Sequence, residues 1–237
     1  MNEQRRTVKH QGGGRSAGVA RAALTFDDGP SAWTDAVLEA LQRRGAKATF
    51  FVLGCAIEGR EEVLRRVITA GCELGVHGYS HRPLTDLSSD EIRDEMRRTI
   101  ALVEEATGQR PRLWRPPQLR ADTRVRAVCA ALRLREVWIT VDTRDYIAGP
   151  DEVVERAVAG LRHRAILLLH DGRAATDAAE ESQMSREGTV MAVPRILSEA
   201  GRRGFRMVTV SEILRPPFRS LSHPAVLWAA SRAVVRR

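Results

Sequence analysis

The 237-residue chain lacks long hydrophobic runs and has few cysteines and aromatic residues. No stretch reaches the roughly 18 consecutive apolar residues of a membrane-spanning helix, and the N-terminal residues lack the apolar region of a secretory signal. The three cysteines, Cys55, Cys72 and Cys129, are odd in number and show no CxxC spacing, so they match neither a disulfide framework nor a zinc knuckle. We therefore expect reduced cysteines and a cytoplasmic location.

The chain also has almost no lysine, although its formal net charge is +8. A positive charge can attract polyanionic partners. However, lysine occurs only at Lys9 and Lys47, the arginines are spread along the chain, and aromatic residues make up 5%, which leaves few rings on which nucleic-acid bases could stack. We expect no nucleic-acid partner, and a non-catalytic binder of nucleic acid or anionic surfaces remains the alternative from another class.

Short apolar runs alternate with helical patterns from residue 19 onward. The predicted strands cover residues 19–26, 47–53, 72–77, 112–115, 136–142, 165–171 and 205–210, and the predicted helices cover residues 33–44, 61–70, 88–107, 123–132, 151–162 and 190–203. Ser88 and Glu91 have the spacing of a capping box at the start of the third helix. This alternation predicts right-handed βαβ units and a parallel sheet. A distorted (β/α) barrel of about seven parallel strands or a doubly wound sheet would fit, in a single α/β domain over residues 19–214.

Three segments fall outside this pattern. Residues 1–18 are polar and glycine-rich, and we expect them to be disordered. Residues 172–188 form a long polar loop, a candidate lid. Residues 215–237 join an apolar stretch to arginines, which fits packing on the barrel or on a second subunit of a homo-oligomer, an amphipathic helix on a membrane surface, or disorder.

Polar residues recur where the predicted strands end. Asp27 and Asp28 follow the first strand within "ALTFDDGP", which taken alone is equally typical of a turn. The carboxyl ends of parallel strands meet on one face, where α/β proteins place their active sites. That face would gather Asp27, Asp28, His77, His81, Arg115, Asp142, Asp145 and His170.

His77 and His81 stand four residues apart in "HGYSH", so on one helical turn both rings would point the same way. Two histidines and a carboxylate form a metal-binding set that leaves positions open for water. Two adjacent carboxylates repel unless one of them binds a cation. The sequence therefore predicts that one of the two aspartates is a metal ligand while the other is free for proton transfer.

Five motifs in order resemble those of the polysaccharide deacetylase family, also called the NodB-homology or carbohydrate esterase 4 group. "TFDDGP" is similar to the first motif, "HGYSH" to the second and "LLLHD" to the fifth, whereas "RPPQ" and "DTRDY" match the third and fourth in part. The resemblance implies a distorted (β/α) barrel and a metal-dependent deacetylase that removes an acetyl group with metal-activated water.

The resemblance also assigns roles to individual residues. It implies that Asp28, His77 and His81 hold one divalent metal, zinc by default, with cobalt, nickel or iron as alternatives. Asp27 would be the general base and His170 the general acid; Arg115 would orient Asp27, Asp145 would raise the pKa of His170, and the backbone N–H of Gln118 would face the oxyanion. Substrate contacts are expected from Gln118, Pro117, Tyr146, Leu168 and Trp33.

Departures from the family pattern fall on the substrate side of the site. Gly78 replaces a hydroxyl residue, Gln118 replaces a tyrosine and Tyr146 a tryptophan, which leaves Trp33 as the aromatic residue expected at the mouth. We therefore expect an acetamido sugar or a small N-acetylated, glycosylated metabolite as substrate. Chitooligosaccharides, peptidoglycan and O-acetyl esters are the alternatives within the same family.

Overall fold

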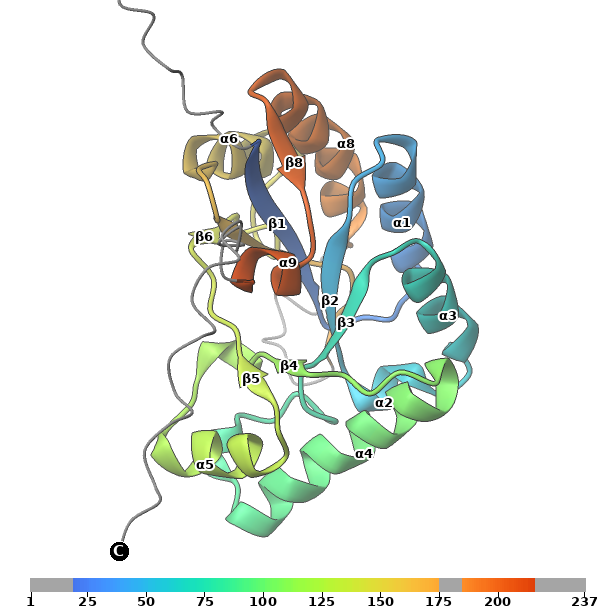
Figure 1. The fold of residues 1–237 in the computed structure, drawn as a ribbon, viewed down its shortest axis with the longest axis vertical. Coiled ribbons are helices and arrows are strands. Elements are labelled where there is room, and N and C mark those ends of the chain that lie inside the picture. Colours follow the sequence, from blue (N-terminus) through green and yellow to red (C-terminus); the bar gives the residue numbers. More distant parts are fainter. Residues whose placement is uncertain (1–18, 175–184, 216–237) are drawn as a thin grey trace, which may run out of the picture.

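A curled parallel β-sheet organises the fold (Figure 1). The computed structural model describes residues 19–174 and 185–215, which form one α/β domain. The strand order is β5-β4-β3-β2-β1-β7-β6, with β8 paired to β1, and each of these pairings is parallel. The strands are β1 (Ala20–Asp27), β2 (Ala48–Val52), β3 (Glu73–Val76), β4 (Leu113–Trp114), β5 (Arg135–Glu136), β6 (Val141–Asp142), β7 (Ile166–His170) and β8 (Phe205–Met207).

Strand β1 lies at the centre and sets the register of the site. Its residues from Ala22 to Asp27 are all buried, which is typical of a strand covered on both faces. It pairs with β8 through its first residues and with β2 and β7 through its last ones, so Asp27 lies opposite Phe51 on one side and His170 on the other. This register brings together two residues that are 143 positions apart in the chain.

Helices cover the outside of the sheet (Figure 1), with α1, α3 and α8 along one side and α4 and α5 at the end that carries β4 and β5. The capping box predicted at Ser88 is confirmed, since its side chain accepts from Glu91 N–H and the Glu91 carboxylate accepts from Ser88 N–H. Pro194 lies inside α8. The helices are α1 (Thr34–Arg43), α2 (Gly54–Ile57), α3 (Glu61–Thr69), α4 (Ser89–Thr107), α5 (Thr123–Ala131), α6 (Pro150–Gly160), α8 (Glu187–Arg202) and α9 (Val210–Leu214), with 3-10 turns at η1 (Leu84–Asp86) and η2 (Pro117–Leu119).

The single strand predicted over residues 136–142 is wrong, because the segment divides into β5 and β6. Val137 N–H donates to Trp114 in β4, whereas Thr140 N–H donates to Ile166 in β7. The segment therefore crosses from one edge of the curled sheet to the other, and Trp138 is 41% exposed between them. A β-rich local pattern does not reveal such a change of partner, since the partners lie far away in the sequence.

The three cysteines are free, with Cys72 and Cys129 buried and Cys55 exposed. Within the described ranges, no helix has the length and apolar character needed to cross a bilayer. The disorder expected over residues 1–18 and the alternatives for the tail after residue 215 concern segments outside the described residues.

Candidate active site

A pocket of about 340 Å³ opens at the carboxyl ends of β1, β3 and β7. The pocket is lined by most of the site residues that the sequence predicts, together with several residues that the sequence does not predict. The lining residues are Asp27, Asp28, His77, His81, Pro116, Gln118, Leu119, Asp142, Tyr146, Leu168, His170 and Arg186. Among the remaining predicted site residues, Arg115 and Asp145 lie behind this lining as partners of Asp27 and His170, while Pro117 and Trp33 are not part of it.

The turn after β1 presents both aspartates in the pocket. Asp28 has a φ of 73°, in the left-handed region that residues other than glycine rarely adopt. The backbone at Gly172 packs closely against Asp28, since a side chain at Gly172 would collide with the Asp28 carbonyl. A strained backbone conformation of this kind is typical of functional sites and is retained only where the neighbourhood enforces it.

Asp28, His77 and His81 form a compact set of possible metal ligands. Asp28 Oδ1 lies 3.4 Å from the Nε2 atom of each histidine, and the three side chains are nearly inaccessible to solvent. This buried carboxylate oxygen has no hydrogen-bond partner, which is unfavourable unless a cation binds it. The set therefore fits a divalent metal, with two nitrogens and one oxygen directed to a common point.

A second contact fixes the orientation of His77. Its Nδ1 lies 2.9 Å from the carbonyl oxygen of Arg115, so the Nδ1–H tautomer donates there and leaves Nε2 for a metal. Burial lowers the pKa of His77, against the charges of Asp27 and Asp28, which raise it. A neutral imidazole is the form that binds metals.

The helical turn expected for "HGYSH" is not formed, since residues 77–83 are a loop and His81 has a φ of 64°. Glu95, from the neighbouring α4, shapes this loop instead. Glu95 is 9% exposed, and its carboxylate accepts hydrogen bonds from the backbone N–H groups of Tyr79 at 2.6 Å and Ser80 at 2.9 Å, and from the Ser80 hydroxyl at 2.6 Å. The two imidazole rings converge, with centroids 5.3 Å apart, because this loop is held in place.

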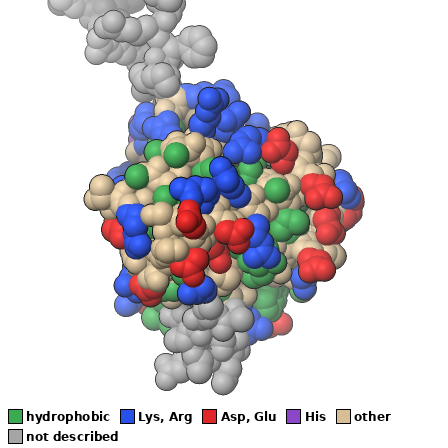
Figure 2. Space-filling view, turned by 90° about the horizontal axis from the view of Figure 1, so that it is seen from below, with side chains coloured by type: hydrophobic (Ala, Val, Ile, Leu, Met, Phe, Trp, Pro, Cys, Tyr) green, Lys and Arg blue, Asp and Glu red, His purple; other side chains and the backbone are tan. Residues whose placement is uncertain are grey.

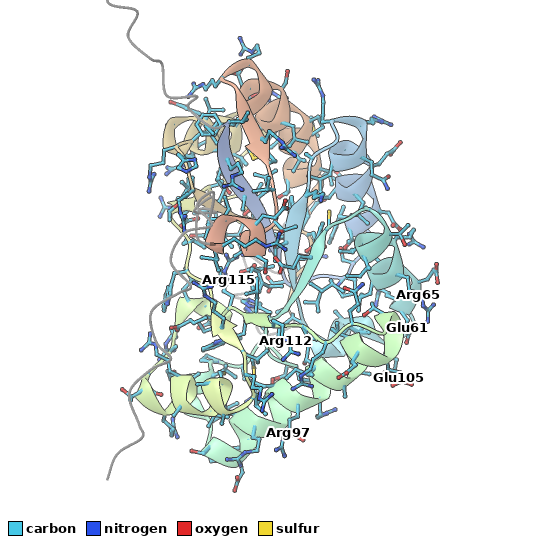
Figure 3. The ribbon with its side chains drawn as sticks, in the orientation of Figure 1. Glu61, Arg65, Arg97, Glu105, Arg112 and Arg115 are labelled. Carbon is cyan, nitrogen blue, oxygen red and sulfur yellow. The ribbon has the colours of Figure 1, made fainter. Side chains whose placement is uncertain are left out.

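Asp27 is held by a buried arginine. Arg115 Nη1 donates to Asp27 Oδ1 at 2.7 Å and to the Thr25 hydroxyl at 2.8 Å, and the guanidinium lies 4.3 Å from the centre of the Phe51 ring. Figure 3 shows Arg115 inside the fold, whereas Arg65, Arg97 and Glu105 lie on outer helices. The other oxygen of Asp27, Oδ2, lies 3.8 Å from His77 Nε2, beside the possible metal position.

His170 and Asp145 form a second buried pair. Asp145 Oδ1 lies 2.8 Å from His170 Nδ1, and Oδ2 accepts from His170 N–H at 2.7 Å and from the Thr189 hydroxyl at 2.6 Å. Burial lowers the pKa of His170, but the charge and hydrogen bond of Asp145, with the charges of Asp28 and Asp27, raise it to about 9. Burial raises the pKa of Asp145, but His170 and Thr189 outweigh this and lower it. His170 is therefore protonated and ready to donate near neutral pH.

The wall formed by η2 and Tyr146 carries two of the residues that are expected to contact the substrate, Gln118 and Tyr146. Gln118 has a φ of 54°, and its N–H has no acceptor in the described part of the chain. Tyr146 packs edge-on against His170, with centroids 5.6 Å apart. Trp33, expected at the mouth, caps α1 outside the pocket lining and lies under Arg173, whose guanidinium is 5.2 Å from the ring centre. Most of the candidate lid, residues 175–184, lies outside the described residues.

Asp171, which ends the fifth motif but was not singled out, connects both halves of the site. It is buried, its Oδ2 accepts from the Thr34 hydroxyl at 2.6 Å, and its backbone N–H donates to the Asp27 carbonyl. Burial raises its pKa to about 7, with the charges of Asp28 and Asp27 acting in the same direction against the Thr34 hydrogen bond.

Sequence reasoning also missed several supporting residues. Thr25 and Asp171 could have been identified, because they are part of the motifs "TFDDGP" and "LLLHD". No local pattern identifies the others, because their roles depend on contacts between distant elements. These are Glu95, Thr189 and Arg186.

Comparison with known proteins agrees with the geometry. The family model for polysaccharide deacetylase matches residues 15–137. A chitooligosaccharide deacetylase from Bradyrhizobium sp. (strain ANU 289) is 34% identical over 82% of this chain and 90% of that protein. A peptidoglycan-N-acetylglucosamine deacetylase from Listeria monocytogenes is 31% identical over 81% of this chain, but the match spans only 38% of that longer protein.

A solved structure shows the same fold. The family 4 carbohydrate esterase from Streptomyces lividans, in complex with acetate, superimposes with a TM-score of 0.69 and 30% identity. The match covers 79% of this chain and 91% of that one. The likeness therefore extends over most of both chains.

Proposed function

Because this chain belongs to the polysaccharide deacetylase family and is a hydrolase of amide C–N bonds, we propose that it is a metal-dependent N-deacetylase acting on an acetamido sugar or a small N-acetylated, glycosylated metabolite. The observation that carries this proposal is the arrangement around Asp28. Its unpartnered, buried Oδ1 lies between His77 and His81, in one pocket with the Asp27–Arg115 and His170–Asp145 pairs.

The metal would be held by Asp28, His77 and His81, and when bound it would polarise the acetyl oxygen and acidify water. Asp27 accepts the proton of the attacking water, with Arg115 holding one carboxylate oxygen. His170 donates a proton to the leaving nitrogen as the C–N bond breaks, and Asp145 stabilises its protonated form. The free N–H of Gln118 faces the developing oxyanion.

The small-substrate proposal is supported by the pocket itself. Its volume of about 340 Å³ falls at the low end of the ~300–1,000 Å³ typical of small-ligand sites. Tyr146 is the one aromatic residue among its described lining residues, so a row of stacking platforms for a polymer is missing there. The alternative is a chitooligosaccharide or peptidoglycan substrate, which the names of the Bradyrhizobium and Listeria relatives favour.

An enzyme is also a better match to the surface than an anion-binding module. Figure 2 shows acidic side chains among the basic ones over the middle of the displayed face. Such mixing weakens long-range attraction for a polyanion, which needs charge of one sign over a continuous surface. Zinc as the native metal, a homo-oligomer and a cytoplasmic location remain predictions.

The test is acetate release by the metal-loaded protein from N-acetyl amino sugars of one to six rings. A small-substrate enzyme should show kcat/KM that stays nearly constant along the series. A rise of about tenfold per added ring, or about 1.4 kcal/mol each, would instead establish the polymer substrate, because remote binding energy would then be used in the transition state. Parallel O-acetyl sugars test the ester alternative, and the Asp27→Asn variant is the control for metal-only hydrolysis.

A further inference from the structure

Arg186 is a buried cation that the proposed mechanism does not use. It directly precedes α8, lines the active-site pocket and is 1% exposed. Its Nε donates to the carbonyl oxygen of Gly172 at 2.8 Å, while its buried Nη1 has no hydrogen-bond partner. Arg186 therefore lines the pocket and has a buried donor that no acceptor of the described residues satisfies.

The charge of Arg186 is also unbalanced. Arg115, the other fully buried arginine at the site, is paired with Asp27 at 2.7 Å. No carboxylate of the described residues forms an ion pair with Arg186. Asp142, on the same pocket, accepts from Arg144 N–H and Tyr146 O–H instead. Burying an unpaired cation is unfavourable, and an anionic ligand would supply the missing charge.

The position of Arg186 indicates which part of a substrate it would meet. Gly172, its hydrogen-bond partner, is two residues after His170, and Thr189, three residues after Arg186, contacts Asp145. Arg186 therefore stands on the side of the proposed general acid. There the amine-bearing part of the substrate lies, whereas the acetyl group lies toward Asp28, His77 and His81.

We propose that Arg186 is a specificity-determining residue that binds an anionic group, a carboxylate or a phosphate, on the amine-bearing part of the substrate. A guanidinium fork matches the planar or tetrahedral oxygens of both groups. This inference rests on the proposed deacetylase function and narrows it to acidic acetamido compounds. The pocket is small enough for one compact molecule to reach both the metal position and Arg186.

The experiment compares matched substrates with the metal-loaded protein. N-acetylglucosamine is the neutral reference. Three derivatives carry an anion on the amine-bearing sugar: its 1-phosphate, its 6-phosphate and its 3-O-lactyl ether. N-succinylglucosamine carries the anion on the acyl group instead. We expect kcat/KM to be about 10–100-fold higher for at least one amine-side anion than for the neutral sugar. The acyl-side anion should give no such gain.

The variants Arg186→Met and Arg186→Lys test the residue itself. Arg186→Met should bring the ratio of kcat/KM for the amine-side anion to kcat/KM for the neutral sugar down toward equality, whatever happens to the neutral rate, and Arg186→Lys should keep part of that ratio because the charge remains. Arg97→Met, on an exposed face of α4, is the matched control and should leave the preference intact. A merely structural Arg186 would lower kcat/KM for neutral and anionic sugars equally, which would overturn the proposal.

Binding measurements separate this inference from the deacetylase proposal. Calorimetric titration of the protein with the 1-phosphate, the 6-phosphate and the lactyl ether should show binding that Arg186→Met loses and Arg97→Met keeps. If no acetamido compound is hydrolysed, the deacetylase proposal fails and this titration still decides the role of Arg186. Equal kcat/KM for neutral and anionic sugars in the wild-type protein would overturn the inference and leave the deacetylase function standing.

Discussion

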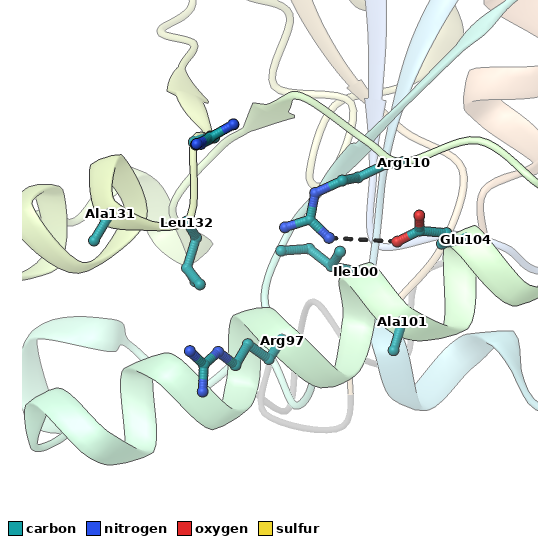
Figure 4. Close-up of a pocket in the computed structure, with 8 residues that line it drawn as sticks. Arg97, Ile100, Ala101, Glu104, Arg110, Ala131 and Leu132 are labelled. Atoms are coloured by element: carbon teal, nitrogen blue, oxygen red, sulfur yellow. Dashed lines mark hydrogen bonds and ion pairs between the residues drawn. The ribbon is translucent and has the colours of Figure 1, made fainter.

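Two pockets of similar volume, about 340 Å³ at the strand ends and about 310 Å³ between α4 and α5, differ in the state of their charged residues. In the first, Asp27 and His170 are each largely buried and joined to a buried partner, Arg115 and Asp145 respectively. In the second (Figure 4), Arg110 and Glu104 form an exposed ion pair at 3.3 Å, and Arg97 extends from the surface of α4.

The difference is one of solvent. Water screens the charges of the α4–α5 pocket, so their ion pair contributes little to the stability of the fold. At the strand ends the same types of side chain are desolvated, so their partners set their orientation and their pKa values. The comparison teaches that the number of charges around a hollow says little until their burial and their partners are known.

The largest expected effect concerns the metal. Replacing Asp28, His77 or His81 by Ala removes one of three converging ligands, and each variant should fall from about one bound metal ion per chain to almost none. Metal analysis of the purified proteins checks this. Full occupancy in all three variants would show that the metal lies elsewhere.

Next come the two proposed proton-transfer groups, Asp27 and His170. Asp27→Asn and His170→Ala should keep the metal and the fold and lower kcat by roughly 10²–10⁴-fold, the usual contribution of a general acid or base. Measuring metal content beside kcat separates the two roles. If Asp27→Asn loses the metal while Asp28→Ala retains it, the roles of the two aspartates are exchanged.

We expect Asp145 to set the pH range in which His170 is protonated. The pKa of His170 is raised to about 9, so activity should fall as the pH rises toward that value and His170 loses its proton. A bound metal cation repels this proton, so the alkaline limb of the pH profile should lie at or below about pH 9. In Asp145→Asn the raising charge is lost, and this limb should move to lower pH by about 1–3 units. The pH profile of kcat checks it, and an unchanged limb would exclude His170 as the acid.

A smaller effect is expected from Glu95, which shapes the loop without touching the metal position. Glu95→Gln loses charge-assisted bonds to Tyr79 and Ser80 and should weaken metal affinity by about 10–100-fold, as for other groups behind metal ligands. Glu105→Gln is the matched control, since Glu105 lies on the exposed face of the same helix (Figure 3). Equal affinities in both variants would mean that the loop holds its shape unaided.

The smallest effect tests the α4–α5 pocket. Glu104→Gln and Arg110→Met remove its exposed ion pair and should each change the free energy of unfolding by less than about 1 kcal/mol. Activity should not change. A loss of activity comparable to that of Asp27→Asn would mean that the two pockets are coupled, and the contrast between them would no longer hold.

Local sequence patterns determined most of the secondary structure of this protein. Apolar runs and glycine stops identified most strands and helices to within a few residues, because burial on a sheet or helix face follows a short period in the sequence. The capping box at Ser88 is visible for the same reason. The convergence of Asp27, His77 and His170 followed from the rule that parallel strands end on one face, and the family resemblance added Gln118, Tyr146 and Leu168 to the predicted pocket lining.

Only the tertiary structure decided the rest. Residues 136–142 change strand partners between β4 and β7, "HGYSH" is a loop held by Glu95, and Arg186 reaches the pocket from the start of α8. Each depends on contacts between segments far apart in the chain, and the local sequence is the same whether or not such a contact forms. The sequence by itself determined which chemical groups meet at the strand ends; long-range packing decided which of them are buried, paired or left with an unmatched charge.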